Sequence, residues 1–123
     1  MSKRSSRVRR GRSSRRPSGI FAADVHVFRF YPDGTVLDVL IKSVPTSADA
    51  AVIETWLRKE SVVAGVHLTH YTLTTDNCLT FTSTSHFRNC IVEVDGVWSA
   101  KRMTLNLREG GRLRRAVRFE KIG

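Results

Sequence analysis

The sequence lacks any apolar run that approaches the roughly 18 residues needed to cross a lipid bilayer. Its N-terminal segment is charged and lacks the apolar stretch of roughly 7–15 residues that a secretory signal needs. We therefore expect a cytosolic protein without a membrane span. The Arg- and Ser-rich leader leaves organelle targeting open as an alternative.

Cysteine is scarce, because Cys78 and Cys90 are the only two in the chain. Their spacing, without any CxxC pair, is not a zinc-binding pattern. A cytosolic setting also disfavours a disulfide between them. We expect two small side chains that are buried or half-buried.

The usual motifs of catalysis are missing as well. The chain has no Gly-rich phosphate loop, no HExxH and no GxSxG, and its carboxylates are scattered. Of the four histidines only His67 and His70 are close in sequence. Residues three apart in a strand point to opposite faces, so this pair cannot share a metal. We expect no enzymatic activity, no metal and no cofactor.

Positive charge is concentrated at the two ends of the chain, whose formal net charge is +10. Residues 1–18 carry eight basic side chains and no acidic one, residues 19–100 carry a net charge of −4, and residues 101–123 carry +6. Residues 1–18 have almost nothing to bury, so we expect a disordered basic arm before a folded domain of residues 19–123. This asymmetry favours a polyanionic partner.

Short strands dominate the predicted folded domain. Residues 25–31 alternate in character, Pro32-Asp33-Gly34 predicts a tight turn, and residues 35–43 form the second strand. After Gly65 five more strand patterns follow, separated by turn residues. Seven strands at close, regular spacing predict a mainly-β protein, a small antiparallel meander closed into a barrel.

One segment has helical periodicity. Between residues 46 and 60, Ala50, Ile53 and Leu57 form one apolar stripe, and Thr46 or Ser47 can cap the first turn. We expect a single helix near residues 47–60 that covers an open end of the barrel, with Trp56 as its anchor.

Several short stretches occur in a characteristic order. They are "FRFYPDGTVL", "YTLTTDN", an Asp-Gly step before "MTLNL", and a final "FEKI". In this order they resemble the small lipocalin-like β-barrel domains, which include the β-rich C-terminal part of some F-box proteins and uncharacterised bacterial relatives. The resemblance spans roughly residues 24–122 and implies a barrel whose interior holds a small ligand. No F-box helices precede the barrel, so a ubiquitin-ligase role is not implied.

Strand alternation assigns side chains to the barrel interior. Arg115 shares the parity of Val117 and Phe119, which is unusual for a cation. Either its stem is buried at the barrel mouth, or it pairs with an acidic ligand or an internal carboxylate. The predicted interior or ligand-facing set is Phe28, Phe30, Tyr71, Phe81, Met103, Leu105, Arg115, Val117 and Phe119.

The last hairpin carries a predicted basic outer face. A turn at Gly110-Gly111 is expected to place Arg102 opposite Arg118 and Asn106 opposite Arg114. Facing like charges cost up to about 1 kcal/mol per pair, and a bound polyanion would relieve this cost. The alternative is an ordinary solvated basic face. The predicted polyanion-binding set is Arg7, Arg9, Arg10, Arg12, Arg15, Arg16, Arg102, Arg108, Arg112, Arg114 and Arg118.

Three functions follow from these features. The first is a non-enzymatic binding module whose barrel holds a small apolar or amphipathic ligand or docks a protein partner. The second is sequence-nonspecific binding of RNA or DNA phosphates through the arm and the basic face. The third is a structural part of a larger assembly. A cavity of roughly 300 Å³ or more favours the ligand, and a continuous basic face favours the polyanion.

Overall fold

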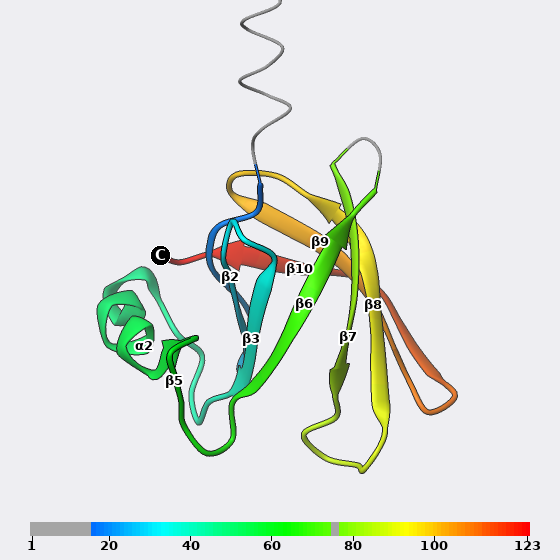
Figure 1. Ribbon diagram of the computed structural model, residues 1–123, viewed down its shortest axis with the longest axis horizontal. Coiled ribbons are helices and arrows are strands. Elements are labelled where there is room, and N and C mark those ends of the chain that lie inside the picture. The colour runs from blue at the N-terminus through cyan, green and yellow to red at the C-terminus, as the bar shows by residue number, and fades with distance from the viewer. Residues whose placement is uncertain (1–15, 75–76) are drawn as a thin grey trace, which may run out of the picture.

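The computed structural model describes residues 16–74 and 77–123 of the chain. Eight antiparallel strands form a closed barrel in the order β1-β10-β9-β8-β7-β6-β3-β2 (Figure 1). Each strand pairs with the next barrel strand along the chain, and β10 closes on β1, so the predicted meander barrel is confirmed. The strands are β1 Gly19–Ala23, β2 His26–Phe30, β3 Thr35–Leu40, β6 His67–Leu73, β7 Cys78–Thr84, β8 Ile91–Trp98, β9 Arg102–Glu109 and β10 Arg112–Lys121.

Strand β1 is absent from the seven predicted strands. Its residues form a continuous apolar run with no alternation, so periodicity did not reveal it. In the structure Phe21 pairs with Phe28 of β2 on one side and with Lys121 of β10 on the other. Asp24 adopts φ 55° in the two-residue turn to β2, a conformation that Asp tolerates. This short strand is the one that closes the barrel.

The predicted Pro-Asp-Gly turn connects β2 to β3. The Gly34 amide donates to the Tyr31 carbonyl (3.0 Å), and the Thr35 amide donates to Oδ1 of Asp33 (3.0 Å). Gly34 has φ 105°, which other residues rarely adopt. The turn fixes the register of β2 and β3, in which Phe28 lies opposite Asp38.

The helix is shorter than predicted. A 3₁₀ turn η1, Ser47–Asp49, begins at a capping box between Thr46 and Asp49, and α2 then covers Ala50–Trp56. The chain leaves the helix at Leu57 and forms β4, Leu57–Arg58, which pairs with β5, Ser61–Val62. The predicted helical residues 57–60 therefore belong to a small hairpin.

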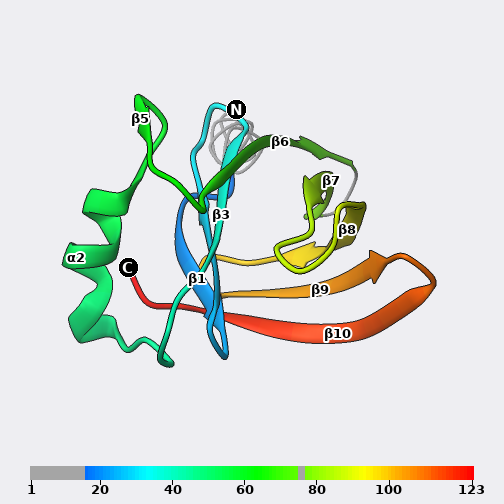
Figure 2. The same cartoon turned by 90° about the horizontal axis from the view of Figure 1, so that it is seen from below.

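Helix α2 lies against the outer wall of β1, β2 and β3 rather than across an open end (Figure 2). Ile53 and Leu57 are fully buried there, in a cluster with Ile20, Val27, Leu37 and Val39. Trp56 is 41% exposed, so the prediction that it anchors the helix is wrong. Ile53 and Leu57 face the barrel, whereas Trp56 lies next to them and remains partly exposed.

The segment around Leu57 is further held by polar contacts. The Leu57 carbonyl accepts hydrogen bonds from Arg29 Nη1 (2.9 Å) and from the Tyr31 hydroxyl (2.7 Å). Lys59 forms an ion pair with Asp33. These contacts connect the outer layer to the β2–β3 hairpin.

Across residues 16–74 and 77–123, no helix is long and apolar enough to cross a membrane. Within the same ranges Cys78 and Cys90 are both half-buried and are not joined by a disulfide. The expectation of half-buried cysteine side chains is confirmed.

Candidate functional site at the barrel mouth

Aromatic rings fill the barrel interior. The Phe28 ring lies at the centre, with its centroid 4.9 Å from that of Phe119, 5.4 Å from that of Phe81 and 5.9 Å from that of Phe30. Such spacings are typical of packed aromatic pairs. The predicted interior positions that lie in this core are Phe28, Phe30, Tyr71, Phe81, Met103, Leu105 and Phe119, which are buried, and Val117, which is half-buried.

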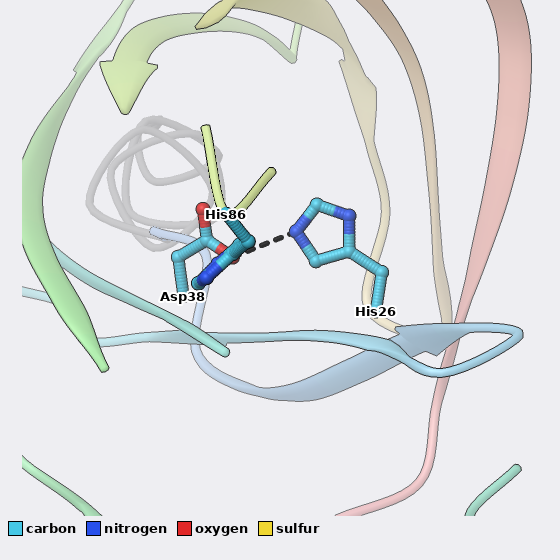
Figure 3. Close-up of side chains that lie close together, drawn as sticks. All are labelled: His26, Asp38 and His86. Carbon is cyan, nitrogen blue, oxygen red and sulfur yellow. Dashed lines mark hydrogen bonds and ion pairs between the residues drawn. The ribbon is translucent and has the colours of Figure 1, made fainter. Parts of the chain in front are cut away.

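The core ends in a polar cluster at the mouth where the β7–β8 loop lies (Figure 3). Asp38 of β3 is 3% exposed. Its Oδ1 is 2.7 Å from Nε2 of His26 and 2.9 Å from Nε2 of His86. The Ser83 hydroxyl donates to Oδ2 (2.7 Å). Both oxygens of the buried carboxylate therefore have partners, as a buried charge requires.

The strands and one loop position these side chains. In β2 and β3 every second side chain points into the barrel. His26 is two residues before the inward Phe28, and Asp38 is two residues after the inward Val36, so both side chains also point inward. His86 lies in the β7–β8 loop, outside any strand. Ser85 holds that loop: its hydroxyl accepts from the amides of Phe87 (3.1 Å) and Arg88 (3.0 Å).

The electrostatics of the cluster are dominated by Asp38. Burial by itself would raise the pKa of this carboxyl group. The hydrogen bonds from His26 and His86, with the hydroxyl of Ser83, outweigh burial and hold the pKa of Asp38 well below its usual range. The side chain is therefore a buried anion.

His67 extends the cluster toward β6. Its ring stacks on that of His86, with centroids 4.2 Å apart and an interplanar angle of 8°. Nδ1 of His67 is 2.9 Å from the Thr84 carbonyl. His67 lies opposite Asp38, and His70 lies opposite Thr35, so these two histidines occupy opposite faces of β6, as predicted. The His67 ring therefore packs face to face against the His86 ring.

Two spaces open beside the cluster. A small cavity of about 30 Å³ is lined by His26, Asp38, Ser83 and His86. A larger cleft of about 320 Å³ adjoins it and continues outward over the β1–β2 turn and the start of β10. The residues that line both spaces are His26, Leu40, Phe87, Leu107, Glu109 and Arg114. We call this larger space the mouth cleft. Its wall is apolar at Ala23, Val25, Leu40, Phe87 and Leu107, and polar at Asp24, His26, Glu109, Arg112 and Arg114.

Phe87 stands out in the mouth cleft, because 81% of its side chain is exposed. Among the residues that the structure describes, Arg112 and Arg114 form no ion pair with an acidic side chain. Glu109, by contrast, accepts a hydrogen bond from the Ser85 hydroxyl (2.8 Å). The cleft thus combines an exposed aromatic ring with two guanidinium groups available to a ligand.

A β-bulge in β10 exchanges the predicted places of Arg114 and Arg115. The register shifts by one residue between Arg114, which lies opposite the buried Leu107, and Val117, which lies opposite Leu105. Arg114 therefore lines the mouth cleft. Arg115 is exposed and lines a hollow on the outer face with Glu93 and Asp95. The predictions of an inward Arg115 and an outward Arg114 are both wrong.

Asn106 holds this bulge. Its Oδ1 accepts from the amide of Ala116 (3.0 Å), which adopts φ 53°, and its Nδ2 donates to Asp95 (2.9 Å). A non-glycine residue in this left-handed conformation needs such support. The bulge, and with it the position of Arg114, depends on a side chain of the neighbouring strand.

The prediction that Arg102 lies opposite Arg118 on the last hairpin is also wrong. Arg102 lies opposite Glu120 and pairs with it (2.8 Å), and Arg118 lies opposite Thr104. Arg108 approaches Glu93 at 3.6 Å. These acids interrupt the basic face that the predicted register made continuous.

The basic arm falls largely outside the described residues, which is where Arg7, Arg9, Arg10, Arg12 and Arg15 lie. Arg16 is exposed and its guanidinium lies 6.0 Å from the centroid of the Tyr71 ring. The next residue, Pro17, is buried. The last residues of the predicted arm thus contact the barrel.

A separate apolar groove lies between α2 and the barrel wall. It has a volume of about 680 Å³, and Val39, Ile41, Val52, Trp56 and Val63 form much of its lining. Its polar lining includes one cation, Lys42, and one acid, Asp49. The groove is larger than the mouth cleft but lies away from the buried Asp38.

Sequence reasoning missed the convergence of His26, Asp38 and His86. Two signals were present: His26 shares the parity of Phe28 and Phe30, and Asp38 interrupts an apolar strand. A buried carboxylate on such a strand requires a partner. The loop position of His86, however, has no periodicity, and its contact with Asp38 joins residues 48 apart in the chain.

Comparisons of the chain with protein-family models, with curated proteins and with solved structures found no match.

Proposed function

We propose that this protein is a non-enzymatic binding module that takes a small amphipathic ligand with an anionic group in the mouth cleft. The observation that carries the proposal is that the exposed Phe87, Arg112 and Arg114 line one cleft of about 320 Å³. This volume lies in the range of about 300–1,000 Å³ that small-molecule sites occupy. The aromatic wall suits the apolar part of a ligand and the guanidinium groups suit its anion.

The packed interior supports the mouth as the binding place. Because Phe28, Phe81 and Phe119 fill the barrel centre, a ligand inside the barrel would have to displace buried rings. The mouth cleft requires no such displacement. The groove beside α2 suits an apolar compound, yet it lacks the guanidinium groups that would select an anion.

The first prediction uses two dyes that share one aromatic body. Anilinonaphthalene sulfonate carries an anion, and N-phenylnaphthylamine does not. We expect the sulfonate to bind the folded chain at least about tenfold more tightly, since one hydrogen bond to a charged group contributes about 1.5–3 kcal/mol. Fluorescence titration measures both affinities. The Arg112→Ala/Arg114→Ala variant should remove the preference for the sulfonate.

Two matched variants control this titration. Arg118→Ala removes an exposed cation outside the cleft and should leave both affinities unchanged. Val52→Glu places a charge in the groove beside α2 and should also leave sulfonate binding intact. Loss of binding in Val52→Glu alone would place the dye in the groove. Because Asp24 and Glu109 also line the cleft, tighter binding of a cationic dye would contradict the proposal.

A second candidate function is sequence-nonspecific binding of a polyanion. The favouring observation is the charge of residues 1–18, which hold eight basic side chains and no acid. On the barrel itself the ion pairs of Arg102 with Glu120 and of Arg108 with Glu93 weaken the case. The arm would therefore supply most of the electrostatic attraction.

The second prediction separates the arm from the barrel. Binding of labelled RNA or DNA is titrated against salt for the full chain and for a shortened chain that begins at Arg16. If the arm contacts phosphates, the full chain should show a steep salt dependence, and the shortened chain should bind at least about tenfold more weakly at low salt. Equal salt slopes for the two chains would exclude the arm as the contact.

A further inference from the structure

Three metal-ligating side chains converge at the barrel mouth. The ligand atoms of His26, Asp38 and His86 all lie within 4.8 Å of one another. They come from β2, from β3 and from the β7–β8 loop, which are brought together only by the closed barrel. We propose that Nε2 of His26, Nε2 of His86 and a carboxylate oxygen of Asp38 bind one divalent transition-metal ion (Figure 3).

The three ligand atoms are close enough to share one ion after a small displacement. Both Nε2 atoms lie 2.7–2.9 Å from Oδ1 of Asp38, which is hydrogen-bond contact, whereas ligands that are each about 2.0–2.2 Å from a tetrahedral zinc are roughly 3.3–3.6 Å apart. Binding of the ion therefore replaces the two hydrogen bonds and moves each nitrogen roughly 0.5 Å or more away from Oδ1. The adjoining cavity of about 30 Å³ has room for the ion's remaining ligand, since a water needs about 10–15 Å³ by this measure.

Neighbouring groups orient the three ligands. Ser83 donates to Oδ2 of Asp38 (2.7 Å), which leaves Oδ1 directed toward the histidines. His67 stacks on His86 and restricts its ring plane. The His26 ring packs against Phe28, with centroids 4.5 Å apart. In known metal sites, contacts from groups that touch the ligands rather than the ion orient the ligands in this way.

The ligand set indicates the class of metal. Two imidazole nitrogens and one carboxylate oxygen suit Zn²⁺, Co²⁺ and Fe²⁺, whereas Mg²⁺ and Ca²⁺ prefer oxygen ligands. Each imidazole must bind through an unprotonated Nε2, so its proton moves to Nδ1 or leaves to solvent. Three protein ligands leave a coordination position open toward the cavity.

This inference goes beyond the proposed function, because the ion needs no organic ligand, and of its three ligands only His26 also lines the mouth cleft. Arg112 and Arg114 carry the dye preference, and neither belongs to the ligand set. The two ideas therefore fail separately. If the Arg112→Ala/Arg114→Ala variant loses dye binding, the metal site is not contradicted. If dye binding is intact, the metal site is not supported by that result.

The test uses the full chain, stripped of metal by a chelator and titrated with Zn²⁺ by calorimetry and with Co²⁺ by absorption. We expect one ion per chain, a rise in Tm of several degrees with Zn²⁺, and a Co²⁺ spectrum of nitrogen and oxygen ligands. His86→Ala should lose this binding, and Ser83→Ala should weaken it about tenfold. His70→Ala, an exposed histidine on the same chain, is the matched control and should bind as the wild type does.

Several results would overturn the metal site. Absence of saturable Zn²⁺ binding by the wild type would leave the cluster as a purely structural hydrogen-bond network. Equal affinity of His86→Ala and wild type would place the ion elsewhere, as would a Co²⁺ spectrum with thiolate charge-transfer bands. Far-UV circular dichroism of the metal-free His86→Ala variant shows whether it folds. If it does not, His86→Gln provides the comparison.

Discussion

Replacing Asp38 by alanine should lower the free energy of unfolding by about 3 kcal/mol, because hydrogen bonds to a buried charged group contribute about 1.5–3 kcal/mol each and the members of one network do not add fully. The carboxylate accepts from His26, His86 and Ser83 and is 3% exposed. Chemical denaturation of metal-free protein measures the loss. Asp95→Ala is the control, since this exposed aspartate accepts from Asn106 on the outer face.

The same substitution should change the acid dependence of stability. The folded pKa of Asp38 lies below its ordinary value of 3.8. Its stabilising contribution is therefore complete above that ordinary value and is lost as the pH falls below it toward the folded pKa. Asp33, whose pKa is lowered chiefly by its hydrogen bond with Lys59, is present in both proteins and cancels in the difference. Parallel stability curves for wild type and Asp38→Ala below pH 4 would contradict this account.

Replacing Phe30 by alanine should be at least as damaging, with an expected loss of about 3–5 kcal/mol, because it leaves a cavity in a packed core. The Phe30 ring is 1% exposed and lies 5.8 Å from the rings of both Phe21 and Phe81, measured between centroids. Urea denaturation measures the loss. Phe87→Ala removes the same atoms from a side chain that is 81% exposed, and it should change stability by less than about 0.5 kcal/mol.

This pair of substitutions also tests where a ligand binds. Phe87→Ala should weaken binding of the sulfonate dye, because Phe87 lines the mouth cleft. Phe30→Ala, if it remains folded, should retain dye binding at the mouth. A cost below about 1 kcal/mol for Phe30→Ala would indicate a loosely packed interior. A ligand inside the barrel would then have to be reconsidered.

The strand pattern was sufficient to predict the barrel and most of its core. Period-2 alternation placed Phe28, Phe30, Met103, Leu105 and Phe119 inside, because a half-buried strand leaves little choice of face. The same rule failed at β1, whose residues are apolar on both faces: Phe21 packs inside the barrel, and Ile20 packs under α2. Both faces of β1 are covered and both are apolar, so this strand lacks the alternation on which the prediction depends.

The site was less predictable because two of its features are not local. The bulge that turns Arg114 into the mouth cleft is held by Asn106 on another strand. A single inserted residue reverses the facing of the side chains before it, so Arg114 and Arg115 exchange places. The contact of His86 with Asp38 likewise depends on the course of a loop. Neither feature leaves a periodic signal in the chain.

The excess of basic residues at the two ends of the chain was evident from composition. The ion pairs that some of these arginines form with acids on the barrel were not. The predicted register set arginine against arginine, and the observed register sets Arg102 against Glu120. At the end of the β9–β10 hairpin that is far from its turn, the observed register differs from the predicted one by two residues of β10. On the outer face this register gives Arg102 an acidic partner, whereas the bulge places Arg114 in the mouth cleft.

The measurement that tests the central claim most directly is a titration of isotope-labelled protein with anilinonaphthalene sulfonate, followed by amide NMR. We predict progressive, saturable shifts confined to the mouth cleft, at Ala23, Val25, Phe87 and Arg114, with the signals of Val52 and Trp56 unmoved. Shifts centred on Val52 and Trp56, or on the buried core residues Phe30 and Phe81, would contradict a ligand site at the barrel mouth.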